Sequence, residues 1–406
     1  MDYPKLRHVN IFQTEMAGRK LICLQDPQSI SEKSLFLPLP LYFVVSLCDG
    51  QHSFLDIQSE YMRRFGEFLF TDKLEEIIRQ LDENLFLEGE RFQEVLQQVE
   101  ERFRKCPVRE AAFAGKSYES DPERLRSQLE PYFREPEGTP GSGGEADSLK
   151  GVVAPHIDFQ RGGGCYGFAH REIGLRNFSR CFIIFGIAHG EMKQAFCLTR
   201  KRFLTPLGGL DADQELIEAL QSRCSYDLFQ DESAHRSEHS IEFQCVFLRY
   251  LYPEPAAIRI VPVLCGSLHE AISKGVSPME LKPFREFIEA LKESVSSLRR
   301  EVCAIASADL AHMGLQFGDL RGMNDYDLRI LEGEDRDMLG YVERRDGEGF
   351  FQSILREKDR RKVCGLPAIY AMLHSLEAKE GRLLNYGQAY TPETQSVVSF
   401  ASLAFY

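Results

Sequence analysis

The stretch Cys181-Phe-Ile-Ile-Phe-Gly186 decides the fold of most of the chain. It is an almost unbroken apolar run of strand length that ends at a glycine, which is typical of a strand covered on both faces. Three more runs of this kind stand at Gly151–Pro155, Ile258–Leu264 and Val302–Ala306. Helical patterns accompany them at Asp213–Arg223, Pro283–Ser297 and Leu366–Glu380. This alternation predicts an α/β fold in which helices cover both faces of a sheet.

The first 105 residues carry a different pattern, dominated by helical stretches. Helices are predicted at Leu39–Leu47, from Ser53 to Phe65, from Thr71 onward and at Phe92–Phe103, with a short strand and turn at Leu85–Glu90. Ser53 is a good helix cap, and apolar residues after Thr71 recur at helical spacing. Three helices followed by a strand is the order of a winged helix-turn-helix, so residues 1–105 are predicted to form a winged-helix-like module.

The charge balance argues against nucleic acid as the partner of this module. Its candidate recognition stretch, Lys73–Asp82, has two basic against three acidic residues, and the whole chain of 406 residues has 49 basic against 62 acidic ones, a net charge of −13. Neutralisation of phosphates supplies most non-specific affinity for nucleic acid. We therefore expect the module to dock a peptide or protein, or to pack subunits.

The second region, residues 106–406, contains one segment with little to bury. Residues 136–149 are rich in glycine, proline and serine, which predicts a flexible loop inside this second domain.

Nothing in the sequence indicates a membrane or secreted protein. No apolar run approaches the roughly 20 residues that span a bilayer, and Met1–Phe12 lacks the apolar core of a signal peptide. The eleven cysteines are an odd number and form no CxxC pair. We therefore expect a cytoplasmic protein with reduced thiols.

Polar side chains follow the predicted strands at the point where each strand ends. His156 follows the first, His189 the second, and Asp309 and His312 the last. In open α/β sheets ligands bind at the carboxyl ends of the strands, so these residues are expected to converge. A neutral imidazole at His156 can bind a metal, with Asp158 or a carbonyl orienting its other nitrogen. The alternative is a histidine hydrogen-bonded in a turn.

Two further groups combine carboxylate and imidazole. Asp309 and His312 stand three apart and, in one helical turn, would form an acid–base or orienting pair. The alternative is a helix cap at Ser307 or Asp309 beside a surface histidine. In Glu238-His-Ser-Ile-Glu242, which opens a helix, Glu238, His239 and Glu242 are neighbours suited to proton transfer or to support of a metal. The alternative there is a charged helix start favoured by the helix dipole.

Cys364 stands directly before a predicted helix start at Gly365-Leu-Pro367. A thiol near a helix N-terminus has a lowered pKa, and its thiolate is a soft ligand for iron, copper or zinc. The alternative, as for the other cysteines, is a small buried apolar side chain.

Residues 106–406 resemble the Memo family, whose bacterial members are called AmmeMemoRadiSam system protein B, because they carry a series of the family's sequence segments in the same order. The segments that carry the resemblance are Arg109–Tyr118 with the helix Leu125–Phe133, Ala154-Pro-His156, the turn from Gly186 to His189, Glu238–Glu242, Ile260–Leu264, Ser307-Ala-Asp309 with His312, Cys364-Gly365 and Ser396–Phe400. The ordered series is more specific than any single piece. Residues 1–105 lie outside the core family and are similar to winged-helix modules attached to some bacterial relatives.

The resemblance implies a fold similar to the class III extradiol dioxygenases, a mixed-sheet α/β sandwich around a non-haem metal site. It implies His156, His189 and Cys364 as metal ligands. It also implies His312 as general base with Asp309 in support, and it leaves His239 and Glu242 to shape the pocket.

The chain also departs from the family pattern at three places. Where the family has paired histidines, His189 is followed by Gly190, and Phe113 and Gln244 stand where many members carry histidine.

The function implied is that of a non-haem-iron redox enzyme acting on a small or aromatic molecule, with Fe2+ as the expected metal and copper or zinc as alternatives. The family association implies radical-SAM and AMMECR-type partner proteins. Two other functions remain open: a non-catalytic metal- or peptide-binding or chaperone protein, and a zinc-dependent hydrolase. Function depends on the site rather than on the fold.

Overall fold

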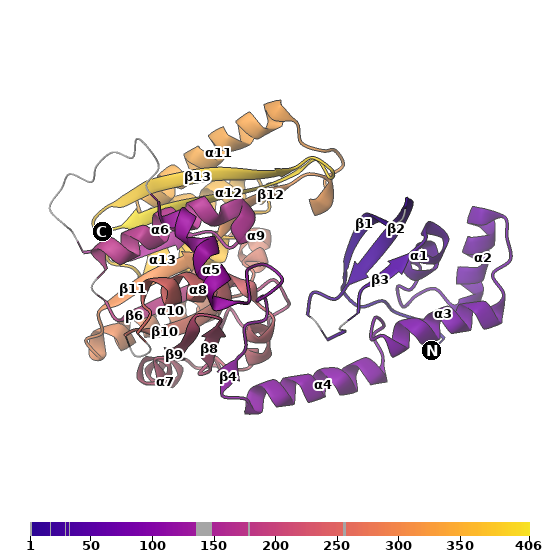
Figure 1. The fold of residues 1–406 in the computed structure, drawn as a ribbon, viewed down its shortest axis with the longest axis horizontal. Helices are drawn as coiled ribbons and strands as arrows, with labels where there is room; N and C mark the ends of the chain where they lie inside the picture. The colour runs from indigo at the N-terminus through magenta and orange to yellow at the C-terminus, as the bar shows by residue number, and fades with distance from the viewer. Residues whose placement is uncertain are drawn as a thin grey trace. The chain divides into compact units, whose positions relative to one another are not determined.

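The computed structural model describes residues 2–16, 18–28, 30–31, 33–134, 148–177, 179–254 and 257–406. The chain forms two compact units, Met1–Lys105 and Cys106–Tyr406, which are described separately (Figure 1). The predicted flexible loop at 136–149 falls mainly outside the described residues. Its last residue, Leu149, is fully buried, so the end of that segment belongs to the core and the prediction was too long there.

The four predicted strands form the centre of one mixed sheet in the larger unit. They are neighbours and run parallel, in the order β5 (Gly151–Ala154), β11 (Val302–Ser307), β6 (Cys181–Ile187) and β10 (Arg259–Cys265). Because all four run the same way, their carboxyl ends lie at one edge of the sheet. The predicted α/β class is confirmed.

Further strands extend the sheet on both sides. Next to β5 lies β14 (Ser396–Phe405), antiparallel to it. Strand β14 in turn pairs antiparallel with β13 (Gly381–Thr391) and β12 (Asp309–Met313). Beyond or beside β10 lie β9 (Gly208–Ala212), β8 (Arg202–Thr205), β4 (Val108–Arg109) and β7 (Phe196–Leu198).

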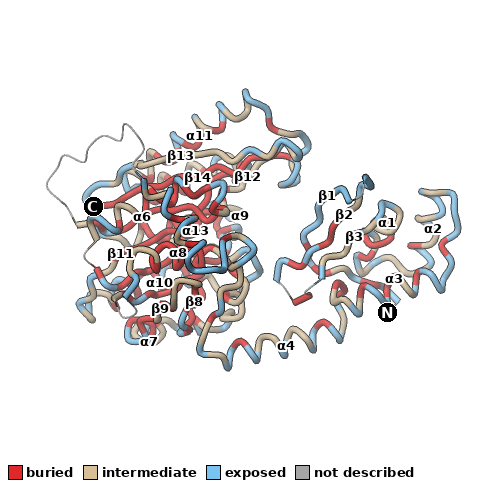
Figure 2. Tube along the Cα trace, viewed as in Figure 1, coloured by how far each residue is buried: buried red, intermediate tan, exposed pale blue. Residues whose placement is uncertain are grey.

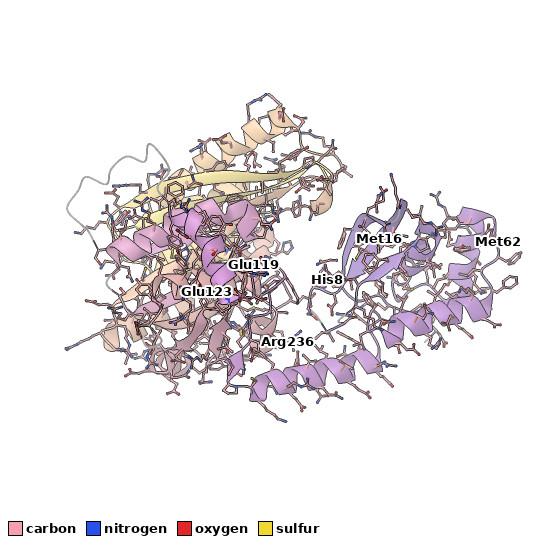
Figure 3. The ribbon with its side chains drawn as sticks, viewed as in Figure 1. His8, Met16, Met62, Glu119, Glu123 and Arg236 are labelled. Carbon is pink, nitrogen blue, oxygen red and sulfur yellow. The ribbon has the colours of Figure 1, made fainter. Side chains whose placement is uncertain are left out.

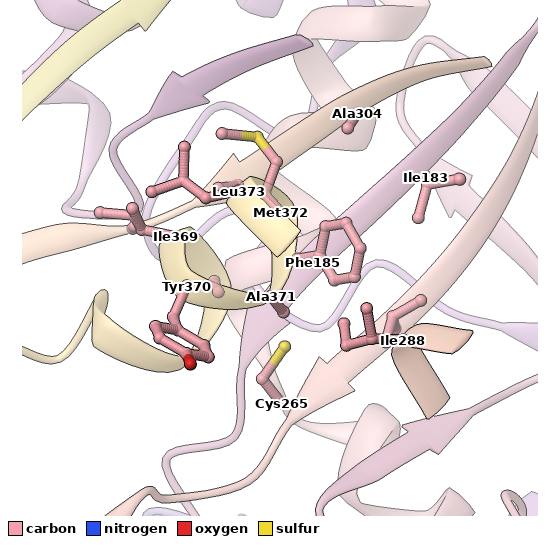
Figure 4. Close-up of a cluster of buried hydrophobic side chains, with 14 of the residues drawn as sticks. Ile183, Phe185, Cys265, Ile288, Ala304, Ile369, Tyr370, Ala371, Met372 and Leu373 are labelled. Carbon is pink, nitrogen blue, oxygen red and sulfur yellow. The ribbon is translucent and has the colours of Figure 1, made fainter. Parts of the chain in front are cut away.

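Alternate residues of β6 face two different layers of helices. Phe182 and Ile184 pack with α6 (Phe159–Arg176) and α8 (His239–Leu251). Ile183 and Phe185 pack on the other face with α10 (Lys282–Ser297) and α13 (Leu366–Ser375), as Figure 4 shows. Each fully buried side chain of this size contributes about 1.5–3 kcal/mol of transfer free energy. Figure 2 shows the resulting buried core.

The remaining helices complete these layers and the loops between them. They are α5 (Pro122–Leu129), η1 (Glu130–Phe133), α7 (Gln214–Arg223), η2 (Glu232–Arg236), α9 (His269–Lys274), η3 (Pro278–Glu280), η4 (Leu315–Phe317), α11 (Asp325–Glu343) and α12 (Gly347–Arg356). The helix predicted to run to Glu380 ends at Ser375, because the backbone is extended at Leu376 before β13 begins.

The smaller unit begins with a sheet that the sequence reading did not predict. Its antiparallel strands are β1 (Asn10–Met16), β2 (Arg19–Gln25) and β3 (Leu35–Leu37). The helices follow as α1 (Leu39–Ser46), α2 (Phe54–Phe65), α3 (Thr71–Glu83) and α4 (Glu90–Lys105). Ser53 caps α2 as predicted, and Met16 and Met62 are among the exposed side chains (Figure 3).

The predicted strand at Leu85–Glu90 is reduced to one antiparallel bridge, between Leu87 and Leu6. Two backbone hydrogen bonds flank it, from Arg7 N–H to the carbonyl of Phe86 at 3.0 Å and from Glu88 N–H to the carbonyl of Lys5 at 2.7 Å. A turn lies at Leu85, before this bridge, and α4 begins at Glu90. The hairpin of this unit therefore precedes its helices, and the winged-helix assignment stays a prediction. No described helix is long and apolar enough to cross a bilayer.

Candidate metal centre

His156 lies two residues after the end of β5 and is only 2% exposed. Its Nδ1–H donates to the carbonyl oxygen of Ser307, the last residue of β11, at 3.0 Å, which leaves the lone pair of Nε2 available. Oδ1 of Asp309 accepts the backbone N–H groups of His156 at 2.9 Å and of Ile157 at 3.2 Å. Asp158 takes no part in this, because it caps α6. The end of β11 thus fixes the His156 ring.

His189 lies two residues after the end of β6, and its side chain is 42% exposed. The carboxylate of Glu238 holds it twice: Oε2 accepts the backbone N–H at 3.0 Å, and Oε1 accepts Nδ1–H at 3.0 Å. The same carboxylate caps α8 by accepting the backbone N–H of His239 at 2.8 Å. It also lies 3.3 Å from Nδ1 of His239. One buried carboxylate therefore orients two imidazoles.

A glycine lets the start of α8 approach the sheet closely. A Cβ atom at Gly186 would lie 2.5 Å from Cγ1 of Ile241 and 2.7 Å from Oγ of Ser240. Oγ of Ser240 also bonds both backbone groups of Ile187, at 2.9 and 3.1 Å. These contacts place His239, the first residue of α8, beside the end of β6.

The three imidazoles converge on one point. A ligand nitrogen from each of His156, His189 and His239 lies within 4.8 Å of the other two. The rings of His189 and His239 are stacked with centroids 4.7 Å apart, and the ring of His156 stands across both, at 5.1 and 5.4 Å. The prediction named His156 and His189 as ligands and His239 only as a pocket residue, whereas the geometry makes His239 an equal member of the cluster.

Cys364 lies against the same cluster. Its Sγ is 3.3 Å from Nε2 of His156 and 3.7 Å from the carbonyl oxygen of Asp309. The segment is close because Gly365 donates its N–H to that carbonyl at 2.9 Å, and a Cβ at Gly365 would stand only 2.4 Å from it. The glycine is therefore needed for this approach.

The pKa shifts follow from burial and from neighbouring charge. Burial lowers the pKa of His156 to about 3 and that of His239 to about 3, assisted by the other imidazoles and opposed by Glu238. Burial also acts to lower the pKa of His189, but the charge and hydrogen bond of Glu238 outweigh it and raise the value. The prediction of a lowered pKa for Cys364 is wrong for the metal-free chain, since burial and then the charge of Asp309 raise it.

Asp309 and His312 do not share a helical turn as predicted, because both belong to strand β12. In a regular strand, residues three apart point to opposite faces of the sheet. The pairing of β12 with β14 is irregular between Asp309 and His312, so this rule does not hold for them. Burial lowers the pKa of His312, with Asp309 opposing. Nδ1 of His312 lies 3.2 Å from the carbonyl oxygen of Leu310, and Oδ2 of Asp309 lies 3.6 Å from Nε2 of His156. Asp309 is thus an anchor of the His156 loop.

Glu242 is engaged elsewhere. Its fully buried carboxylate pairs with Arg109 and accepts bonds from the hydroxyl of Tyr118 and from the backbone N–H groups of Ala112 and Phe113. Arg109 also donates to the carbonyl oxygens of His235 at 2.9 Å and Glu238 at 2.6 Å. These contacts make Glu242 part of the scaffold under the start of α8 and do not support the predicted acid–base role.

Two residues that orient the cluster are Glu238 and Ser307. For Glu238 the sequence predicts proton transfer or support of a metal beside His239, and its contacts agree with the support role. Its reach to His189 depends on the packing of α8 against the end of β6, which the sequence does not show. Ser307 acts through its main-chain oxygen, which no sequence pattern reveals.

The donor set suits a transition metal ion. Imidazole nitrogen and thiolate sulfur are ligands of zinc, copper and iron, whereas calcium and magnesium prefer oxygen. Low pKa values keep His156 and His239 neutral, the form that binds metal. Exposure rises from His156 to His189, so the cluster is open to solvent on one side.

The comparisons with known proteins agree on one family. The family profile described as Memo-like protein matches residues 109–404. A MEMO1 family protein of Aquifex aeolicus is 29% identical over 406 residues, covering 99% of this chain and 100% of its own length. A MEMO1 family protein of Methanopyrus kandleri is 30% identical over 307 residues, covering 73% of this chain and 98% of its own. One from Pyrococcus abyssi is 28% identical over 313 residues, covering 73% and 98%.

Proposed function

Because the chain belongs to the Memo-like protein family, we propose that it binds a transition metal ion, Fe2+ in the first place, and uses it in redox chemistry on a small or aromatic molecule. The ion would be held by His156, His189 and His239, with Cys364 as a further ligand. The convergence of three ring nitrogens within 4.8 Å carries this proposal.

The chain's own residues would perform the other tasks of the site. Ser307 and Glu238 fix the ring orientations of the ligands, and Asp309 holds the backbone of the His156 loop. His312 would move a proton close to the metal. The bound metal would supply one-electron redox chemistry and polarise a coordinated oxygen atom.

The surroundings of His239 support a substrate with an apolar, planar part. The ring of Phe113 contacts the ring of His239 edge-on with centroids 5.4 Å apart, and the ring of Phe243 lies 5.1 Å from His239 and 5.8 Å from Phe113. Phe113 is only partly buried, so it can offer its ring to a bound molecule. The family association adds a radical-SAM protein and an AMMECR-type protein as proposed partners.

Anaerobic purification followed by metal analysis tests the metal site. One equivalent of iron, lost in His156→Ala and retained in the surface control His269→Ala, is the expected result. Retention of the full equivalent by His156→Ala contradicts the assignment.

Oxygen uptake on addition of catechol-like compounds to the iron-loaded chain tests the redox part. Uptake by the wild type and not by the metal-free chain is expected. If the chain binds one equivalent of metal but consumes no oxygen with any of the catechol-like compounds, the non-catalytic function, as a metal- or peptide-binding or chaperone protein, would be favoured. Zinc retained during purification in air would favour a hydrolase.

A further inference from the structure

Gln244 is a fully buried polar side chain on α8, one turn beyond Ser240. Its Nε2 donates two hydrogen bonds, both 2.8 Å long, to the carbonyl oxygen of Pro155 and to Oγ of Ser307. Pro155 is the residue before His156. Ser307 ends the neighbouring strand β11. A single amide group therefore joins α8 to the two backbone segments that surround His156.

The second of these segments also fixes the His156 ring. The carbonyl oxygen of Ser307 accepts Nδ1–H of His156 at 3.0 Å, and Oγ of Ser307 donates to the carbonyl oxygen of Ser240 at 2.6 Å. Ser307 is thus held from α8 at two points, by Ser240 and by Gln244. Any shift of Ser307 would rotate the imidazole whose Nε2 faces Cys364.

The other end of the Gln244 amide indicates that stability alone does not explain it. Oε1 of Gln244 is buried and has no hydrogen-bond partner among the described residues. A buried acceptor without a partner costs free energy. A methionine has a similar length and no such acceptor, so it would fill the space without that cost. The carbonyl of Pro155 and the hydroxyl of Ser307 would each lose a donor, so the two effects on stability oppose each other.

We propose that Gln244 is a positioning residue of the metal centre: its amide sets the backbone at Pro155 and Ser307, and through them the direction of the His156 ring. This inference rests on the proposed function, since it takes His156 to be a metal ligand. A residue behind a ligand of this kind tunes metal affinity and ligand field rather than folding.

The test uses the full chain and Co2+ as a spectroscopic probe. Gln244→Met should leave the thermal midpoint of the metal-free chain close to that of the wild type. It should lower Co2+ affinity about 10–100-fold and shift the visible absorption bands of the bound Co2+. Ser294→Ala is the matched control, because Oγ of Ser294 is also buried with no hydrogen-bond partner in the described part of the chain and belongs to α10, on the other face of the sheet from α8. It should change neither affinity nor bands.

The outcomes separate the inference from its premise. A wild-type chain that binds no Co2+ would overturn the proposed function and the inference with it. A wild type that binds Co2+ beside a Gln244→Met chain of equal affinity and identical bands would overturn the inference alone. If Gln244→Met does not fold, Ser307→Ala removes the hydroxyl that receives the amide while keeping the carbonyl that holds His156; unshifted Co2+ bands in that variant would equally overturn the inference.

Discussion

The sulfur atom of Cys364 lies 3.3 Å from Nε2 of His156, although 208 residues separate them in the chain. The two side chains come from the loop after β5 and the loop before α13, which meet only because both lie at the carboxyl edge of the sheet. Since Nδ1–H of His156 donates to Ser307, the thiol is the donor in this contact. A thiol that already faces a ligand nitrogen is well placed to share a metal ion with it.

Replacement of this thiol should remove a specific spectroscopic signal. In Co2+-loaded protein, a thiolate ligand gives a near-ultraviolet charge-transfer band, and we expect Cys364→Ser to lose that band. Three imidazoles remain, so some Co2+ should still bind, with an affinity reduced by more than about tenfold. Absorption titrations measure both quantities. A band that persists in Cys364→Ser would mean that another group supplies the sulfur.

Substitution of the neighbouring glycine should disturb the site by a steric route. A Cβ in Gly365→Ala would stand 2.4 Å from the carbonyl oxygen of Asp309 and 2.6 Å from Cβ of Ala308, so the Cys364 segment must move away. We expect a loss of about 1–3 kcal/mol in the free energy of unfolding and weaker Zn2+ binding. Gly333→Ala is the control, because an added Cβ on α11 meets nothing within 4 Å; it should stabilise by about 0.5–1 kcal/mol. Chemical denaturation and calorimetric Zn2+ titration provide the measurements, and equal behaviour of the two variants would refute the steric explanation.

Removal of the Glu238 carboxylate should weaken both helix α8 and the metal site. Glu238→Ala loses the helix cap, which costs about 0.5–2 kcal/mol, together with the group that orients His189 and His239. Zn2+ affinity should fall about 10–100-fold. Asp213→Ala, which removes a capping carboxylate from α7 instead, is the matched control and should lose stability without losing affinity. Loss of affinity in both variants would indicate a general effect of helix fraying.

The smaller unit should become unstable in acid through one buried ion pair. Asp26 has a fully buried carboxylate that binds Arg7 and the backbone N–H groups of Ile30 and Ser31. Burial acts to raise the pKa of Asp26, but the hydrogen bonds and charge of Arg7 outweigh it, so the folded value lies below the usual one. The pair's stabilisation is therefore present above about pH 4, the unfolded pKa, and is lost as pH falls through the lower folded pKa.

Hydrogen exchange of residues 2–105 measures this effect, since the chain has no tryptophan to report it by fluorescence. Asp26→Asn should reduce stability by up to about 3–5 kcal/mol at neutral pH, because Arg7 stays buried without its partner. The variant should also lose the decline in protection below pH 4. A decline of unchanged size in Asp26→Asn would assign the acid sensitivity to other carboxylates.

The parts of the fold that were predicted correctly are those with strong apolar patterns. The runs at Gly151 and Cys181 are strands because both faces are covered, and α3 was recognised because Leu74, Ile77 and Leu81 repeat at helical spacing. Strand β1 was missed because nearly all of its side chains are exposed, which leaves no alternation to detect. The short segment from Asp309 to His312 fits a helix turn and a strand equally well, and only its pairing with β14 decides.

The candidate site was predictable where its residues stand at strand ends and unpredictable where contacts join distant segments. His156 and His189 follow β5 and β6 directly, so parallel topology brings them together. The membership of His239 depends on how closely α8 approaches Gly186, and the scaffold role of Glu242 depends on its pairing with Arg109. Both contacts join segments far apart in the chain, so no local sequence pattern predicts them.

The position of Arg109 has a practical consequence for dissecting the protein. It stands four residues after the last residue of α4, yet its guanidinium is the tie that secures the residues from His235 to Glu242. A shortened chain that lacks the leading unit must therefore still begin no later than residue 108, so that it keeps β4 and Arg109. A chain that begins after Arg109 would lose these contacts to the segment that positions His239. Any loss of metal binding would then be mistaken for dependence on the missing unit.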